Sequence, residues 1–293
     1  MTGTLFVVGT PIGNLEDLTD RARRTLAGVD LIAAEDTRRT GKLLAAAGIE
    51  RPRLLSLFDA NERSRTPRVL KMLREGKDVA LVSDGGMPLV SDPGYAVVRA
   101  VAAEGVDVRV VPGPSSAVAA LVVSGLPTDR WVFEGFLPKK TVERRRRLEA
   151  VRDDPRTLIF FESPARIHGL LRDMLRVFGD RPAAVCRELT KLHEEVLRGT
   201  VSEVLAALGE DVKGEVVVVV GGNRSARVPD VGAIVDEVVE LVDDGMRKRD
   251  AVRTVAERHG VSANALYRAL LDARETDATG VLTPPSVPRR STP

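Results

Sequence analysis

Three turns rich in glycine and proline carry the polar residues best suited to bind a small ligand. They are 9–14, with the sequence Gly-Thr-Pro-Ile-Gly-Asn, 83–88, with Ser-Asp-Gly-Gly-Met-Pro, and 111–117, with Val-Pro-Gly-Pro-Ser-Ser-Ala. Glycine lets a ligand approach the backbone, and Asp84, Ser115 and Ser116 add hydrogen-bonding groups. Each residue type is also common in ordinary turns and helix caps, so the turns are informative as a set.

The first turn differs from the dinucleotide-binding fingerprint of nicotinamide enzymes. Pro11 stands where that fingerprint needs a second close-approach glycine, and the residues after Gly13 do not open directly into a helix. A nicotinamide cofactor is therefore not expected at this turn.

Each of the three turns follows a short hydrophobic run that predicts a buried strand. Such runs occur at 5–8, 31–34, 79–83 and 108–111, and amphipathic helical stretches separate them. This alternation predicts a parallel sheet with crossover helices, in which the carboxyl ends of the strands meet at one edge. The three turns should therefore line one crevice.

A second group of strands predicts a second α/β lobe after the break at 125–128. Its expected strands are 131–134, 157–161, 183–188 and 215–220. The predicted fold class is therefore α/β, with one lobe at 1–125 and another at 126–225.

The C-terminal part has a different pattern. Residues 231–243 and 247–271 have helical hydrophobic spacing, and Ser262 is a suitable N-cap in a helix-turn-helix-like arrangement. We predict a small helical domain at 230–274. The segment 275–293 is rich in Pro, Thr and Ser with little apolar pattern, so we expect a disordered tail there.

The composition limits the classes of function. The 293 residues are 43% hydrophobic and 29% charged, with a formal net charge of +2, which excludes a polybasic coat but permits a local basic patch. A single cysteine, Cys186, and three scattered histidines predict neither a disulfide framework nor a metal site. No apolar stretch approaches the roughly 20 residues that span a bilayer, and no signal-peptide pattern is evident, so we expect a cytoplasmic protein.

Eight short motifs follow one another along the chain. They are GTPIGNL at 9–15, AEDTR at 34–38, SDGGMP at 83–88, DPG at 92–94, PGPS at 112–115, EGFLP at 134–138, FES at 161–163 and RELTK at 187–191. Each is weak alone, but their order closely resembles the tetrapyrrole methylase superfamily, and within it the methyltransferases of small-subunit ribosomal RNA. The resemblance runs from about Leu5 to Gly222 and extends into the helical C-terminal part.

The resemblance implies a fold of two α/β lobes of the tetrapyrrole methylase type, with S-adenosylmethionine held between them. It also implies 2′-O-methylation of a cytidine ribose in 16S rRNA of the small ribosomal subunit by a homodimer. In the first lobe, the implied cofactor-binding residues are Pro11, Ile12, Asp84, Gly85, Met87, Ser115 and Ser116. In the second lobe they are Phe161, Leu189 and Glu215.

Two positions depart from the family pattern. The stretch 58–62 often carries histidines where Phe58 and Ala60 stand here, so no histidine serves as a base there. Met87 occupies a position where threonine is usual, which removes a side-chain hydrogen bond but leaves backbone contacts possible.

Methyl transfer to a hydroxyl needs in-line alignment and a group that accepts the hydroxyl proton. The candidate bases are Glu35, Asp36 and Glu62, with Arg38 and Asn61 as orienting groups. Each also has a structural interpretation, because Asp36 could cap a helix and Glu62 could lie in the first turn of one.

An RNA substrate also needs cationic contacts. Six cations occur within nine residues: Lys139, Lys140, Arg144, Arg145, Arg146 and Arg147. They are expected to contact phosphates, although such a run is also typical of a solvated helix face. The C-terminal pattern carries a second basic set that could instead belong to a packing or dimer module: Arg247, Lys248, Arg249, Arg253, Arg258 and Arg268.

Two alternatives remain at this point. A tetrapyrrole (porphyrin or corrin) methyltransferase would explain the ligand-binding turns but not the basic segment. A non-enzymatic nucleic-acid-binding regulator would use the helical domain as reader and the α/β part as an effector-binding domain.

Overall fold

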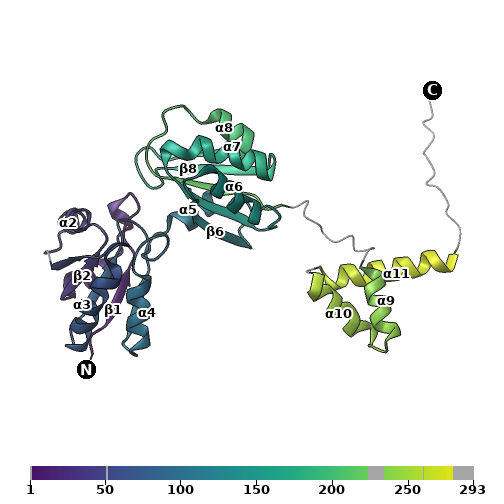
Figure 1. Ribbon diagram of the computed structural model, residues 1–293, viewed down its shortest axis with the longest axis horizontal. Helices are drawn as coiled ribbons and strands as arrows, with labels where there is room; N and C mark the ends of the chain where they lie inside the picture. Colours follow the sequence, from purple (N-terminus) through teal and green to yellow (C-terminus); the bar gives the residue numbers. More distant parts are fainter. Residues whose placement is uncertain (1, 51, 224–233, 260, 280–293) are drawn as a thin grey trace. The chain divides into compact units, whose positions relative to one another are not determined.

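The computed structural model describes residues 2–50, 52–223, 234–259 and 261–279. They fall into two compact units, Met1–Asn223 and Arg224–Pro293. The first unit holds two five-stranded sheets, and the described part of the second is helical (Figure 1). This architecture confirms the predicted α/β fold with two lobes and C-terminal helices.

The first sheet is parallel throughout and has the strand order β3-β2-β4-β1-β5. Its strands are β1 (Leu5–Val8), β2 (Leu31–Ala34), β3 (Arg53–Ser56), β4 (Val79–Val82) and β5 (Val108–Val111). All four predicted strands are present. The sequence pattern missed β3, an edge strand that begins at an exposed arginine and has one fully buried residue. Because β1 lies between β4 and β5, the turns that follow these three strands share one edge.

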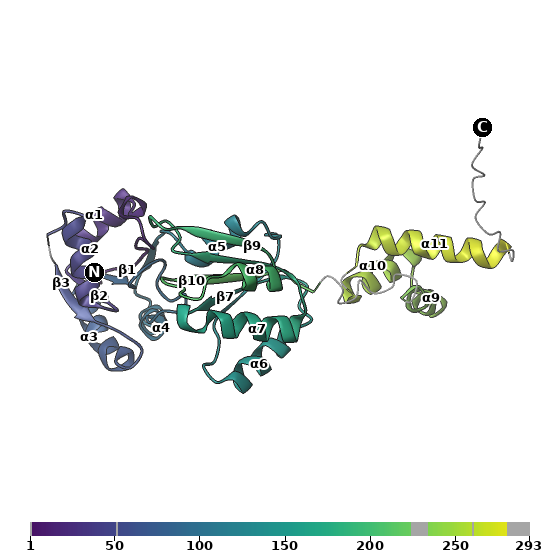
Figure 2. The same ribbon diagram turned by 90° about the horizontal axis from the view of Figure 1, so that it is seen from above.

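Helices cover both faces of the first sheet (Figure 2). On one face, α1 (Asp20–Gly28) and α2 (Thr37–Ala46) pack through Leu26 and Leu44 against β-strand residues such as Ile32. On the other face, α3 (Glu62–Arg74) and α4 (Tyr95–Ala103) pack through Leu73 and Val101. Burial on both faces explains why the strands read as continuous apolar runs.

The second sheet is mixed and has the order β6-β7-β10-β8-β9. Its strands are β6 (Trp131–Phe136), β7 (Thr157–Glu162), β8 (Pro182–Arg187), β9 (Glu195–Thr200) and β10 (Val216–Val220). Only β6 and β7 pair in parallel, and the all-valine strand β10 lies at the centre. One face is covered by α6 (Thr141–Ala150), α7 (Ile167–Phe178) and α8 (Val201–Ala207).

Helix α5 (Ser116–Ser124) covers the other face of the second sheet. Its residues Ala117, Ala120 and Leu121 are buried in a cluster with Ile159, Cys186 and Val219 of the second sheet. The expected lobe boundary at 125 therefore follows α5 in sequence, whereas the packing changes from the first sheet to the second before Ser116.

The second unit packs three helices around one small core. They are α9 (Val235–Asp243), α10 (Lys248–His259) and α11 (Ala263–Thr279). Val238, Val255 and Leu266 are fully buried between them, and the backbone N–H of Ala265 donates to the hydroxyl of the expected N-cap residue Ser262 at 3.4 Å. Because α11 continues to Thr279, the disordered tail expected from 275 does not begin there, and 280–293 lie outside the described residues.

Among the described residues, no helix combines the length and the apolar character needed to cross a membrane.

Candidate active site

The three predicted turns meet at the carboxyl edge of the first sheet. The backbones of Thr10 and Gly86 exchange two hydrogen bonds, at 2.9 and 3.0 Å. Gly9 and Gly113 lie so close that a Cβ atom added to Gly9 would fall 2.7 Å from the Cα of Gly113. Glycine at both positions is therefore what allows the first and third turns to touch.

A cleft of about 620 Å³ opens beside these turns and is lined by residues of both lobes. Its size is that of an ordinary small-ligand site. Seven of the ten residues predicted to contact a cofactor line it: Pro11, Ile12, Asp84, Gly85, Ser116, Phe161 and Glu215. The crevice expected from the sequence is therefore present.

The other three predicted cofactor residues lie behind the lining. The sulfur of Met87 accepts a hydrogen bond from the backbone N–H of Gly113 at 3.3 Å and so links the second turn to the third. Ser115 precedes α5, and its carbonyl accepts from the N–H of Ala119. Leu189 is buried in the cluster that contains Ile12. All three residues support the cleft from positions outside its lining.

Carboxylates dominate the first-lobe side of the cleft. The Asp84 carboxylate accepts from the backbone N–H of Asp36 at 3.0 Å and pairs with Arg39 at 3.2 Å. The Glu35 carboxylate accepts from the N–H of Asp84 at 3.2 Å, and Asp92 lines the same wall. Three acidic groups thus share one partly enclosed space.

Burial, with a smaller contribution from the neighbouring carboxylates, raises the pKa of two of the carboxyls. Burial is the main reason that the pKa of Asp92 rises to about 6; the neighbouring Ser83 hydroxyl offsets part of the rise, and nearby carboxylates such as Glu35 add to it. Burial also raises the pKa of Glu35, against the opposing effect of its hydrogen bond from Asp84. Both groups are therefore stronger proton acceptors than an ordinary carboxylate.

Of the candidate catalytic residues, Glu35 alone lines this cleft. Asp36 caps α2 by accepting from the N–H of Arg38 at 2.8 Å, and it also pairs with the Arg38 guanidinium. Hydrogen bonds from Arg38 lower the pKa of Asp36 to about 2, which makes Asp36 a weak base. These contacts favour the capping interpretation of Asp36.

Asn61 and Glu62 are also engaged in local structure. The Asn61 side chain accepts from the backbone N–H of Phe58 at 2.8 Å, which closes the turn before α3. Glu62 accepts from the N–H of Ala96 at 2.6 Å, at the start of α4. Both residues position helices beside the cleft and do not line it.

Several lining residues were not expected from the sequence. Asp92 belongs to the DPG motif and Arg39 directly follows the AEDTR motif, but neither was expected to line a site. From the second lobe, Phe136 is 58% exposed and packs edge-on to Phe161, with ring centroids 5.4 Å apart. Lys191 bonds to Glu188 at 2.8 Å and reaches Glu215 at 3.4 Å. The sequence feature that could have identified these residues is their position at the end of a strand, or within or next to one of the motifs.

Fewer cations of the basic segment 139–147 are free to contact RNA than its sequence indicates. Arg144 is buried, and its Nε atom donates to Asp173 of α7 at 2.7 Å. Arg145 donates to the other oxygen of the same carboxylate at 2.6 Å, and Arg147 donates to Glu134 at 2.7 Å. Arg144 therefore joins α6 to α7 and is corrected from an expected RNA contact to a structural residue.

Comparisons with known proteins agree with this architecture. Residues 4–205 match the family described as Tetrapyrrole (Corrin/Porphyrin) Methylases. The chain is 45% identical to "Ribosomal RNA small subunit methyltransferase I" of Escherichia coli O157:H7, over 92% of this chain and 95% of that protein. It is 50% identical to the protein of the same name from Thermotoga maritima, over 76% of this chain and all of that protein.

Solved structures share the fold of the first unit. The crystal structure of uroporphyrin-III-C-methyltransferase from Thermus thermophilus is 27% identical, with a TM-score of 0.55 over 75% of this chain and 94% of that chain. Another structure of that enzyme, 22% identical with a TM-score of 0.52 over 75% of this chain and 97% of that chain, is described as complexed with S-adenyl homocysteine.

Proposed function

Since the chain belongs to the tetrapyrrole methylase family and, within it, to the ribosomal RNA small subunit methyltransferases I, we propose that it methylates a cytidine ribose in 16S rRNA at the 2′-hydroxyl. The chain is an S-adenosylmethionine-dependent rRNA methyltransferase. The observation that carries the proposal is the convergence of three strand-end turns on one cleft, within the residues that match the family.

The donor set of the cleft fits S-adenosylmethionine. Glu35, Asp84 and Asp92 place carboxylates on one wall, which suits a ligand with a sulfonium and an ammonium group. Backbone groups of Pro11 and Ile12 and the side chain of Phe161 offer contacts for an adenosine. When bound there, the cofactor supplies an electrophilic methyl group, and the lining residues align it with the acceptor oxygen.

We assign the role of general base to Glu35. The 2′-hydroxyl is a poor nucleophile, so its proton must leave as the new oxygen–carbon bond forms. The Glu35 carboxylate accepts that proton, and its raised pKa makes it better suited than Asp36, whose pKa is lowered by Arg38. Asp36, Arg38, Asn61 and Glu62 then keep the surrounding helix starts in place.

RNA contacts are proposed for the exposed members of the basic segment. Lys139, Lys140, Arg146 and Arg147 are exposed on α6 and the turn before it. That turn follows β6, whose last residue, Phe136, lines the cleft. Cations beside the cleft would hold the backbone while one nucleoside enters, because phosphate contacts set position without reading sequence.

A homodimer is the proposed assembly, in the cytoplasm. Val110 of the edge strand β5 is 55% exposed, and Val118 and Val122 of α5 are 45% and 69% exposed. Burial of these side chains against a second copy would remove apolar surface from water. Light scattering should then show a dimer for the unmodified chain and a monomer for Val122→Glu.

Incubation with radiolabelled S-adenosylmethionine and small ribosomal subunits that lack the modification tests the activity. Label at the 2′-oxygen of a cytidine in 16S rRNA supports the proposal. Label that appears only in an added porphyrin would instead support a tetrapyrrole methyltransferase. Cofactor binding without transfer to either substrate would support a non-enzymatic regulator.

A further inference from the structure

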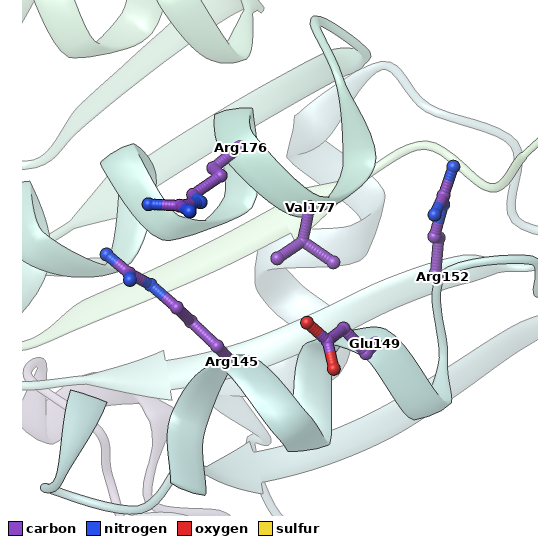
Figure 3. A pocket seen from close by; sticks show the side chains of 5 residues that line it. All are labelled: Arg145, Glu149, Arg152, Arg176 and Val177. Atoms are coloured by element: carbon purple, nitrogen blue, oxygen red, sulfur yellow. The ribbon is translucent and has the colours of Figure 1, made fainter. Parts of the chain in front are cut away.

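A second, smaller pocket lies between α6 and α7, and three arginines surround it (Figure 3). It has a volume of about 230 Å³ and is lined by Arg145, Glu149, Arg152, Arg176 and Val177. None of these residues lines the large cleft. We call this pocket the arginine groove.

The cations of the arginine groove are largely uncompensated. Neither Arg152 nor Arg176 has a side-chain hydrogen bond or ion pair with another residue in the described part of the chain, and both are exposed. Arg145 gives its Nε–H to Asp173, while its side chain stays 38% exposed. Glu149 is the one acidic residue that lines the groove. The groove therefore carries a local positive charge on a chain whose net charge is only +2.

The side chains are arranged around a shared space. In Figure 3, Arg145 and Arg176 direct their guanidinium groups toward the same end of the pocket, and Arg152 extends beside the other end, with Glu149 between them. These arginines come from two helices and the turn after α6, so the fold brings them together. A guanidinium presents a planar fork of N–H donors that matches the oxygens of a phosphate.

We propose that the arginine groove binds phosphate groups of the ribosomal RNA backbone, outside the cleft where methyl transfer takes place. This inference rests on the proposed function and extends it to a second contact surface. Helix α6 follows the strand that ends at Phe136 in the cleft wall, and it carries Arg145 in its first half, with Arg152 just beyond its end. An RNA strand that leaves the cleft along α6 meets the groove.

The groove contacts position the RNA and do not take part in methyl transfer. Phosphate contacts add affinity that weakens with salt and is independent of the base sequence. The groove should therefore affect the affinity for RNA and its salt dependence, while affinity for S-adenosylmethionine stays unchanged. This separation gives a readout distinct from activity.

The test compares Arg152→Gln, Arg176→Gln and the double variant with the unmodified chain. Arg24→Gln is the matched control, because Arg24 is an exposed arginine on α1 that lines neither pocket. Affinity for small ribosomal subunits lacking the modification is measured from 50 to 200 mM salt. Each lost phosphate contact should reduce the slope of log affinity against log salt by about one. For the double variant the slope should therefore be smaller by about two. Its loss of affinity relative to the unmodified chain should then be about 16-fold smaller at 200 mM salt than at 50 mM salt.

Glu149→Gln provides a second variant that predicts a gain. Removal of the single carboxylate that lines the groove should strengthen the binding of ribosomal subunits at low salt. A gain of affinity cannot result from poor folding of the variant. Equal salt slopes for the unmodified chain and the double arginine variant, with no gain from Glu149→Gln, would overturn the proposal. If subunits bind with the predicted salt slopes but no methyl group is transferred, the proposed activity is wrong and the proposal that the arginine groove binds RNA is still supported.

Discussion

Replacement of Asp173 by alanine tests whether the basic segment is partly structural. Asp173 lies on α7 with its side chain 3% exposed, and its two oxygens accept hydrogen bonds from Arg144 and Arg145 of α6. The side chain of Arg144 is itself only 8% exposed. The Asp173→Ala variant would leave a guanidinium buried between two helices without its counter-charge.

The expected loss follows from that burial. Removing one partner of a buried ion pair costs about 4 kcal/mol, because the remaining charge cannot regain its hydration. For a unit of this size, about 1 kcal/mol corresponds to about 3 °C in melting temperature, so Asp173→Ala should melt about 12 °C lower. The double variant Arg144→Met with Asp173→Leu removes both charges and should recover most of that loss.

Thermal unfolding followed by circular dichroism measures these differences. Asp129 is exposed and makes no side-chain hydrogen bond or ion pair in the described part of the chain, so Asp129→Ala is the control and should melt within about 2 °C of the unmodified protein. A drop for Asp173→Ala as small as that of the control would refute the reasoning. So would an Arg144→Met variant that keeps its melting temperature but loses affinity for RNA.

Three further predictions concern the cleft. Glu35→Gln should lower kcat, measured at saturating cofactor, by about 100-fold or more, whereas equal turnover would remove Glu35 as the base. Asp92 has a folded-state pKa of about 6, above its ordinary 3.8, so its ionisation opposes folding increasingly as pH rises from about 4 to about 6. Asp92→Asn should therefore raise the free energy of unfolding by about 1 kcal/mol at pH 8, after allowance for partial solvent exposure, and change it little at pH 3.5; a gain that is the same at both pH values would contradict the shift. Gly9→Ala should lower kcat/KM on the order of 100-fold, because the added methyl group meets the Gly113 backbone and displaces the turns, and normal kinetics would show that the two loops can separate freely.

The sequence predicted all the interior strands and the edge strands β5 and β6, and it missed the edge strands β3 and β9. A short apolar run between two turns, such as Leu31–Ala34 or Val216–Val220, indicates a strand that is buried on both faces. By contrast, β3 and β9 are edge strands with only partial burial, and β9 includes Glu195 and Arg198. Their pairing partners, rather than their own side chains, determine that they are strands.

The candidate site was predictable where glycine and proline follow a strand. The turn that contains Asp84 was identified because its residue types have a specific use at the carboxyl edge of a sheet. The sequence allowed both a catalytic and a helix-start interpretation for Asp36 and Glu62 and could not choose between them, because the choice depends on which N–H groups lie nearby in three dimensions. Likewise, the contact that buries Arg144 involves Asp173, which is 29 positions away in sequence.

The packing of α5 on the second sheet has a mechanical consequence. Strands β1 to β5 precede α5 and β6 to β10 follow it, so the covalent link between the two lobes is the stretch 112–115. Any rocking of one lobe against the other must bend the chain within this stretch, which belongs to the third of the turns proposed to form the cofactor site. A ligand that contacts Ser116, directly after this stretch, would restrict that bending. A fragment cut at 125 would separate α5 from the second sheet, which covers its apolar side.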